Sequence, residues 1–142
     1  MSETVIGIDR VMGIADAIVA DKPEGYGYAD LIKEVTGASY GEQGCVNWSL
    51  FGGTEKVPAC IVGQIVARLG YLDDISAGGA WALSVYTLSG KGVKFTEDAI
   101  RALRTMQLMQ DGGASWKTSV MAARVNVISD CSNRKILELA AK

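Results

Sequence analysis

Three side chains that could take part in chemistry lie on one line of an apolar stretch: Cys60, Gln64 and Arg68. Residues four apart share one face of a helix, so a thiol, an amide and a guanidinium would line up along it. One hypothesis is a small polar site in a groove, and an enzyme that uses Cys60 or Arg68. The alternative, which we prefer, is that Gln64 and Arg68 bond backbone carbonyls or a carboxylate, because buried polar groups need partners.

The absence of histidine removes much of the chemistry that such a site would need. Ser-His-Asp and Cys-His nucleophiles cannot be built, and neither can the common zinc sites that contain histidine. Cys45, Cys60 and Cys131 include no Cys-x-x-Cys pair, so we expect no metal and no cofactor. Their odd number and the lack of an export signal predict reduced thiols in a cytoplasm.

The length and composition are typical of one soluble domain. The chain has 142 residues, of which 49% are hydrophobic, and this size suits a single domain over residues 1–142. The net charge of −2 comes without a basic stripe, so nucleic acid is not an expected partner. Because no apolar run approaches the length of a membrane span, we expect no contact with a membrane.

The apolar stretch from Pro58 to Gly70 is the predicted centre of the fold. A helix that is apolar nearly all round is buried. Proline suits the first turn of a helix and glycine suits its end. Gly63 would allow a neighbouring backbone to approach. We therefore predict a mostly α, single domain of about five helices around a central helix over residues 58–70.

Four further stretches have apolar residues at helical spacing, and each has a plausible start or end. Thr4, Thr96 and Ser115 are the expected N-terminal caps. The predicted helices cover residues 4–21, 76–88, 96–111 and 115–127, and a last short helix carries Ile136, Leu137 and Ala140.

The glycine-rich segment between the first two helices is harder to interpret. A short β-hairpin within residues 25–50 would pair the aromatic run around Tyr26 and Tyr28 with the run from Cys45 to Trp48. Residues 29–35 could instead form a helical turn or two, because short apolar runs are ambiguous.

The motif between helices 96–111 and 115–127 has a structural explanation for each residue. Gln107 and Gln110 flank the inner face, and we expect them to bond across to a neighbour or to the turn. Asp111 is expected to accept hydrogen bonds from the amides that open the next helix, and Gly113 to adopt the left-handed turn. Trp116 would pack back over the turn. We interpret the motif as a determinant of the fold.

The two helices over residues 96–127 also have the outline of a helix-turn-helix motif, so a DNA-binding regulator is the alternative function. A recognition helix needs side chains that read bases and contact phosphates. The second helix offers only Lys117 and Arg124 as cations. We therefore favour a packed helical hairpin.

The outer side of this hairpin is a candidate binding surface. Leu108 points away from the inner face and is flanked by Arg101 and Arg104, and Met121 and Val125 point outward on the next helix. Apolar side chains rimmed by arginine are a composition that interfaces favour. The simpler alternative is a solvated outer face. The patch could hold a partner or, in a homo-oligomer, a second copy of the chain.

Two motifs together resemble those of a known group of proteins. The first is Cys45 followed by Pro58-Ala59-Cys60-Ile61-Val62-Gly63-Gln64, and the second is Gln107-x-x-Gln110-Asp111-x-Gly113-x-x-Trp116-x-x-Ser119-Val120. They are similar to those of small proteins of unknown function encoded by mycobacteriophages and related actinobacterial phages and prophages.

The resemblance spans residues 4–127, and it departs from the usual pattern at three places. Ala59 and Lys117 stand where glycine is frequent, and Val46-Asn47-Trp48 stands where a tyrosine often follows the first cysteine. The group supplies no catalytic residues. The resemblance implies a non-enzymatic phage accessory protein that binds and modulates a host or phage protein in the host cytoplasm.

Overall fold

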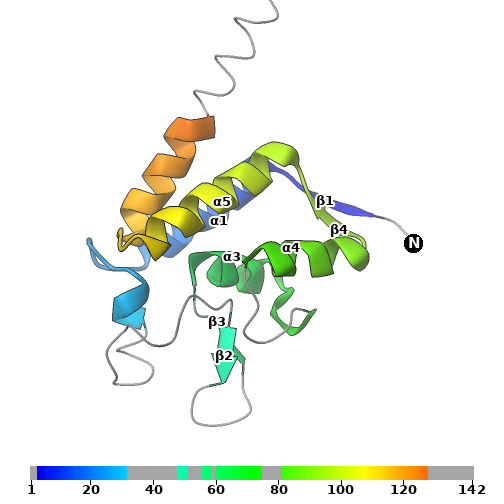
Figure 1. The fold of residues 1–142 in the computed structure, drawn as a ribbon, viewed down its shortest axis with the longest axis horizontal. Coiled ribbons are helices and arrows are strands. Elements are labelled where there is room, and N and C mark those ends of the chain that lie inside the picture. Colours follow the sequence, from blue (N-terminus) through cyan, green and yellow to red (C-terminus); the bar gives the residue numbers. More distant parts are fainter. Residues whose placement is uncertain (1–2, 32–47, 51–55, 59, 75–80, 128–142) are drawn as a thin grey trace, which may run out of the picture.

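The computed structural model describes residues 3–31, 48–50, 56–58, 60–74 and 81–127. It is mostly helical, as predicted, and the described part also contains two short two-stranded sheets (Figure 1). The expected helix around Ile136 lies outside the described residues, as do Cys45 and Cys131. The elements are β1 (Thr4–Ile6), α1 (Ile8–Ala20), β2 (Trp48–Leu50), β3 (Lys56–Pro58), α3 (Ile61–Leu69), the 3-10 helix η1 (Leu72–Asp74), α4 (Trp81–Gly90), β4 (Val93–Phe95) and α5 (Glu97–Asp111), with further helical residues at 28–31 and 116–127.

Helix α3 is the buried centre of the fold, as predicted, and it contacts α1, α5, β3 and η1. Its start differs from the prediction, because Pro58 ends β3 and Cys60 caps the helix. The Cys60 Sγ accepts a hydrogen bond from the backbone N–H of Gly63 at 3.3 Å. The helix ends at Gly70 as expected, with a φ of 94°, a conformation that glycine adopts without strain.

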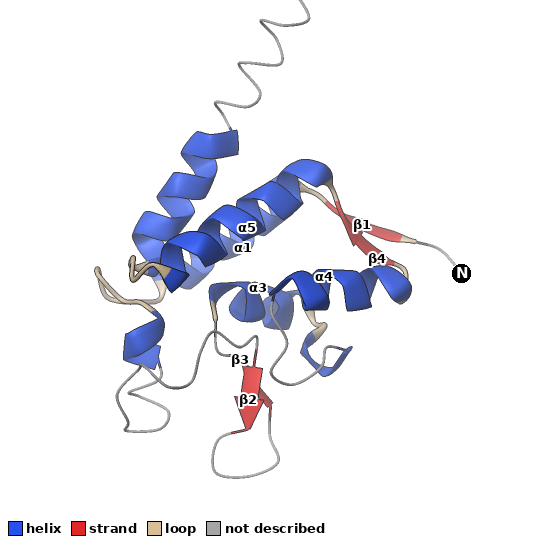
Figure 2. Ribbon diagram, viewed as in Figure 1, coloured by secondary structure: helices blue, strands red, loops and turns tan. Residues whose placement is uncertain are grey.

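A short parallel pair of strands joins the starts of α1 and α5 (Figure 2). The prediction of a helix from Thr4 is therefore wrong at its start: Thr4 pairs with Val93, and Ile6 pairs with Phe95. The run Thr4-Val5-Ile6 is β-branched throughout, a composition that favours a strand. The pairing buries Ile6 and Phe95 and leaves Val5 exposed, so Val5 does not belong to the apolar stripe of α1.

The second pair of strands is an antiparallel hairpin in which β2 pairs with β3 (Figure 2). The predicted hairpin partner around Tyr28 is wrong, because Tyr28 begins the helical residues 28–31. The side chain of Asp30 favours this helical turn by accepting a hydrogen bond from the backbone N–H of Gly27 at 2.8 Å. The alternative of a helical turn near residue 29 is thus confirmed over residues 29–31.

Helix α4 extends to Gly90, two residues beyond the predicted end at residue 88. The turn comes at Lys91 and Gly92, where Gly92 has a φ of 85°. It leads into β4, which the sequence did not suggest. The predicted start of this helix at Ser76 lies outside the described residues.

Helix α5 and the helix over residues 116–127 begin as predicted. Thr96 Oγ1 accepts a hydrogen bond from the N–H of Ala99 at 3.3 Å, and Ser115 Oγ accepts one from the N–H of Thr118 at 3.2 Å. Gly113, with a φ of 96°, turns the chain between the two helices. Figure 1 shows α5 lying along α1, and these two helices are in contact.

Candidate functional site

The line of polar residues on α3 serves the fold. Cys60 is a buried thiol that caps its own helix. Arg68 forms an exposed salt bridge with Asp21, with 2.9 Å between Nη2 and Oδ2. Gln64 is half-buried between them along the helix. The preferred interpretation is confirmed for Arg68, which pairs with a carboxylate.

Gln110 is a buried junction between three segments. Its Oε1 accepts a hydrogen bond from the N–H of Ile61 at 2.8 Å and a second one from Trp116 Nε1 at 3.0 Å. The N–H of Ile61 is one of the amides that the first turn of a helix leaves without an intrahelical partner. Gln110 therefore connects α5 to the start of α3 and to the next helix, as the motif predicted.

Asp111 has a different role from the one expected. Its Oδ1 accepts from Gln107 Nε2 at 3.1 Å and from Gln110 Nε2 at 3.5 Å. The amides of the next helix are capped by Ser115 instead. The reason is that Asp111 is still the last residue of α5, which places it one helical turn after Gln107 and on the same side.

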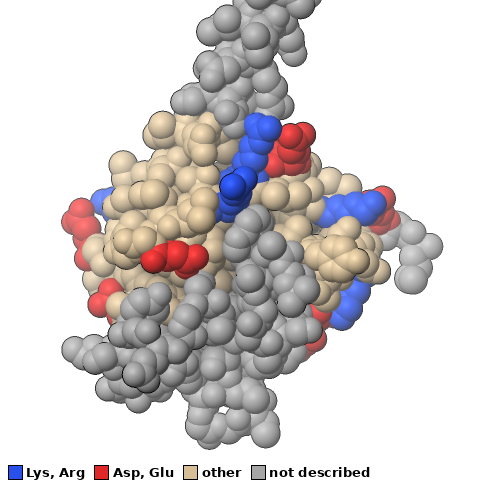
Figure 3. Space-filling model, in the orientation of Figure 1, with Lys and Arg blue, Asp and Glu red and all other residues tan. Residues whose placement is uncertain are grey.

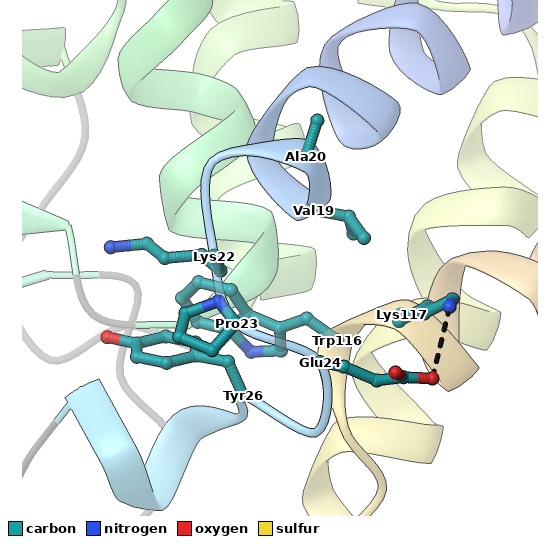
Figure 4. Close-up of a pocket in the computed structure, with 8 residues that line it drawn as sticks. All are labelled: Val19, Ala20, Lys22, Pro23, Glu24, Tyr26, Trp116 and Lys117. Atoms are coloured by element: carbon teal, nitrogen blue, oxygen red, sulfur yellow. Dashed lines mark hydrogen bonds and ion pairs between the residues drawn. The ribbon is translucent and has the colours of Figure 1, made fainter.

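Trp116 packs over the turn as predicted, and it forms part of a pocket of about 300 Å³ (Figure 4). The ring of Tyr26 meets that of Trp116 edge-on, with 5.1 Å between their centroids. The Lys22 Nζ lies 4.8 Å from the centroid of Tyr26, which is cation–π geometry. The pocket is lined by Val19, Ala20, Lys22, Pro23, Glu24, Tyr26, Trp116 and Lys117.

Sequence reasoning missed this pocket, since its lining comes from two segments that are far apart in the chain, residues 19–26 and residues 116–117. Two of its charged groups neutralise each other, because Lys117 Nζ lies 3.3 Å from Glu24 Oε1 (Figure 4). What remains is an apolar recess beside a buried tryptophan. It can hold a small apolar group, but its charges are already paired or placed over a ring.

The structure brings the five residues of the predicted surface together. Leu108, Met121 and Val125 are 58%, 56% and 63% exposed. One hollow, of about 280 Å³, is lined by Arg101, Arg104, Thr105, Leu108 and Asn126. A second, of about 610 Å³, is lined by Thr105, Thr118, Met121, Ala122, Val125 and Asn126.

Thr105 and Asn126 belong to both hollows, and a hydrogen bond of 3.0 Å joins Asn126 Nδ2 to Thr105 Oγ1. The two hollows therefore form one continuous surface across α5 and the helix over residues 116–127. We call this surface the outer face and define it by Arg101, Arg104, Leu108, Met121 and Val125.

Charges on the α5 side of the outer face are ordered along the helix. Figure 3 shows basic side chains over the middle of α5 and acidic side chains toward its ends. Arg101 pairs with Glu97 at 3.0 Å. Arg104 forms no hydrogen bond or salt bridge with any residue that the structure describes. Asp111, which lies two helical turns after Arg104, is exposed.

Among the described residues, no three or more His, Cys, Asp or Glu side chains are grouped so that they could hold a metal ion. None of their helices is both long enough and apolar enough to cross a membrane.

No family model, curated protein or solved structure matches this chain.

Proposed function

We propose that this protein is a non-enzymatic accessory protein of a phage that acts by binding another protein through the outer face. One observation carries the proposal: Leu108, Met121 and Val125 are large apolar side chains exposed on one continuous surface, at the edge of which lie Arg101 and Arg104. Contiguous exposed apolar surface marks interaction sites, and arginine is enriched in the energetically important parts of interfaces.

The chemistry of the other candidate residues supports a binding function over an enzymatic one. Cys60 is buried and caps α3, and Arg68 is paired with Asp21. The resemblance to phage proteins suggests that the bound protein is a host or phage protein in the cytoplasm of an actinobacterium. A second copy of the chain would satisfy the same surface.

The alternative of a DNA-binding regulator would use Lys117 and Arg124 on the second helix of the 96–127 hairpin. Both cations are directed to carboxylates of the N-terminal part of the chain. Lys117 pairs with Glu24 at 3.3 Å, and Arg124 pairs with Asp16 at 2.7 Å. Since binding to DNA depends on cations that neutralise phosphates, these pairs argue against it.

The test is affinity capture from a mycobacterial lysate with the parent chain and with Leu108→Asp, followed by mass spectrometry. We expect Leu108→Asp to keep the helicity and melting temperature of the parent and to lose the captured protein, because a carboxylate would be placed in the apolar centre of the outer face. Tyr86→Asp on α4 is the matched control, since Tyr86 is also an exposed large side chain but lies outside the outer face.

Three outcomes would contradict the proposal. If Leu108→Asp unfolds, Leu108 belongs to the core and the outer face does not exist. If Leu108→Asp folds and captures everything that the parent captures, including copies of the chain itself, the binding surface lies elsewhere. Loss of capture by Tyr86→Asp alone would also place the binding surface elsewhere.

A further inference from the structure

We infer that the protein bound on the outer face is a second copy of this chain, with the α5 helices of the two copies antiparallel. The inference rests on the proposed function, because both need the outer face to bind protein. It goes further by identifying the occupant from the order of the charges along α5.

The exposed side of α5 has a regular pattern. Residues that alternate by four and three positions lie on one side of a helix. The side chains at this spacing are Glu97, Arg101, Arg104, Leu108 and Asp111, so Leu108 is an apolar side chain between a base and an acid. Arg104 and Asp111 are seven residues apart, about 10 Å along the helix axis.

These two charges are available for a partner. Arg104 is exposed and forms no hydrogen bond or salt bridge with the described residues. The hydrogen bonds of Asp111 within the described part of the chain use Oδ1 only, so its Oδ2 has no partner there. A partner that matches this side must carry an acid opposite Arg104 and a base opposite Asp111, at the same separation.

A second copy carries that arrangement when its α5 runs in the opposite direction. A two-fold axis at the level of residues 107 and 108 places Arg104 of each copy opposite Asp111 of the other. The same axis places the two Leu108 side chains side by side at the centre of the contact. The pattern is therefore complementary to itself, which is the requirement for a contact between identical surfaces.

The same symmetry accounts for the rest of the outer face. The axis is perpendicular to the α5 helices and keeps the helix over residues 116–127 on the same side of α5 in both copies. Met121 and Val125 of one copy then face their counterparts in the other. The contact becomes a four-helix arrangement that covers all three exposed apolar side chains, with the charge pairs at its rim.

Charge reversal tests this arrangement directly. In Arg104→Asp, two acids would face each other twice in the dimer, and in Asp111→Arg two arginines would do so. When the two variants are mixed, both pairs become opposite in charge again. The double variant Arg104→Asp/Asp111→Arg restores opposite charges within its own dimer. The measurement is the molar mass of the full chain by sedimentation equilibrium, with melting temperature as the check on folding.

We expect the parent to be a dimer, each single variant to dissociate roughly tenfold or more readily, and the mixture and double variant to regain dimers. Leu108→Asp should be monomeric. Arg10→Asp is the matched control, because it changes the net charge equally on α1, outside the outer face, and should remain a dimer.

A parent that is monomeric at about 100 µM, a concentration that detects even weak association, would overturn the inference. A dimer that is insensitive to both reversals, or that fails to recover in the mixture, would overturn the antiparallel contact. In each case the proposed function survives if Leu108→Asp still loses a captured protein. It fails if Leu108→Asp loses neither self-association nor capture.

Discussion

Helices α3 and α5 both carry polar side chains at helical spacing, but they use them in opposite ways. On α3, Cys60 caps its own helix and Arg68 pairs with Asp21. On the exposed side of α5, Arg104 has no hydrogen bond or salt bridge within the described part of the chain, and Leu108 is exposed. The residue types on α3 are the more suggestive of chemistry, yet those on α5 are available to a partner.

The two sides of α5 show the same contrast within one helix. Gln110 faces inward, where its Oε1 accepts two hydrogen bonds from other segments. Leu108, two residues earlier, faces outward and is exposed. A side chain can serve recognition only if the fold has not already satisfied it. The partners of a residue are therefore better evidence of its role than its type.

The same type of substitution should have opposite effects on the two helices. Ile65→Asp should unfold the chain, because an unpaired charge in the core costs several kcal/mol or more, which is of the order of the whole stability. Ile65 is fully buried on α3. Leu108→Asp should change the free energy of unfolding of the monomer by less than about 0.5 kcal/mol. Urea titration followed by circular dichroism measures both, and an Ile65→Asp variant as stable as the parent would mean that α3 is not the centre of the fold.

Gln110→Ala should have the next largest effect. It leaves the N–H of Ile61 and the Nε1 of Trp116 buried without their acceptor, and each buried donor left unsatisfied costs about 1–3 kcal/mol. Asp111→Asn is the matched control, because it keeps an oxygen that can accept from Gln107 and should stay within about 0.5 kcal/mol of the parent. The urea midpoint, followed by tryptophan fluorescence, would decide; equal midpoints for the two variants would show that Gln110 is not a junction.

Replacing Arg68 and replacing Arg104 should have the smallest effects on stability, and the two replacements should differ mainly in their effect on self-association. Arg68→Ala should lower the free energy of unfolding by no more than about 1 kcal/mol, and less in high salt, because its salt bridge is exposed. Arg104→Ala should leave the free energy of unfolding of the monomer unchanged and weaken self-association. Denaturation and sedimentation on the same samples compare them. A loss of stability from Arg104→Ala would show that its side chain has a partner within the fold.

The sequence by itself determined the elements whose signals are local. Thr96 and Ser115 cap helices through amides three residues away, and Gly70 ends α3 with its own backbone conformation. The outward direction of Leu108 and of Val125 follows from the helical period alone. Such features are predictable because the interacting groups are close in the chain.

Only the tertiary structure decided the features that depend on distant partners. The run Thr4–Ile6 has helical periodicity with the residues after it, and it becomes a strand because β4 lies beside it. Gln110 meets Ile61, and Trp116 meets Tyr26, across segments whose separation no local pattern encodes.

Some features of the outer face were likewise predictable from the sequence, and others were decided by the tertiary structure. The outward direction of its five residues was predictable from the helical period. Whether these residues form one surface depends on how α5 packs against the helix over residues 116–127, where Asn126 donates a hydrogen bond to Thr105. That Arg104 has no partner in the described part of the chain while Arg124 pairs with Asp16 is also a property of the packing. The reason is physical: whether a charge is satisfied depends on which distant groups the fold brings within a few ångströms of it.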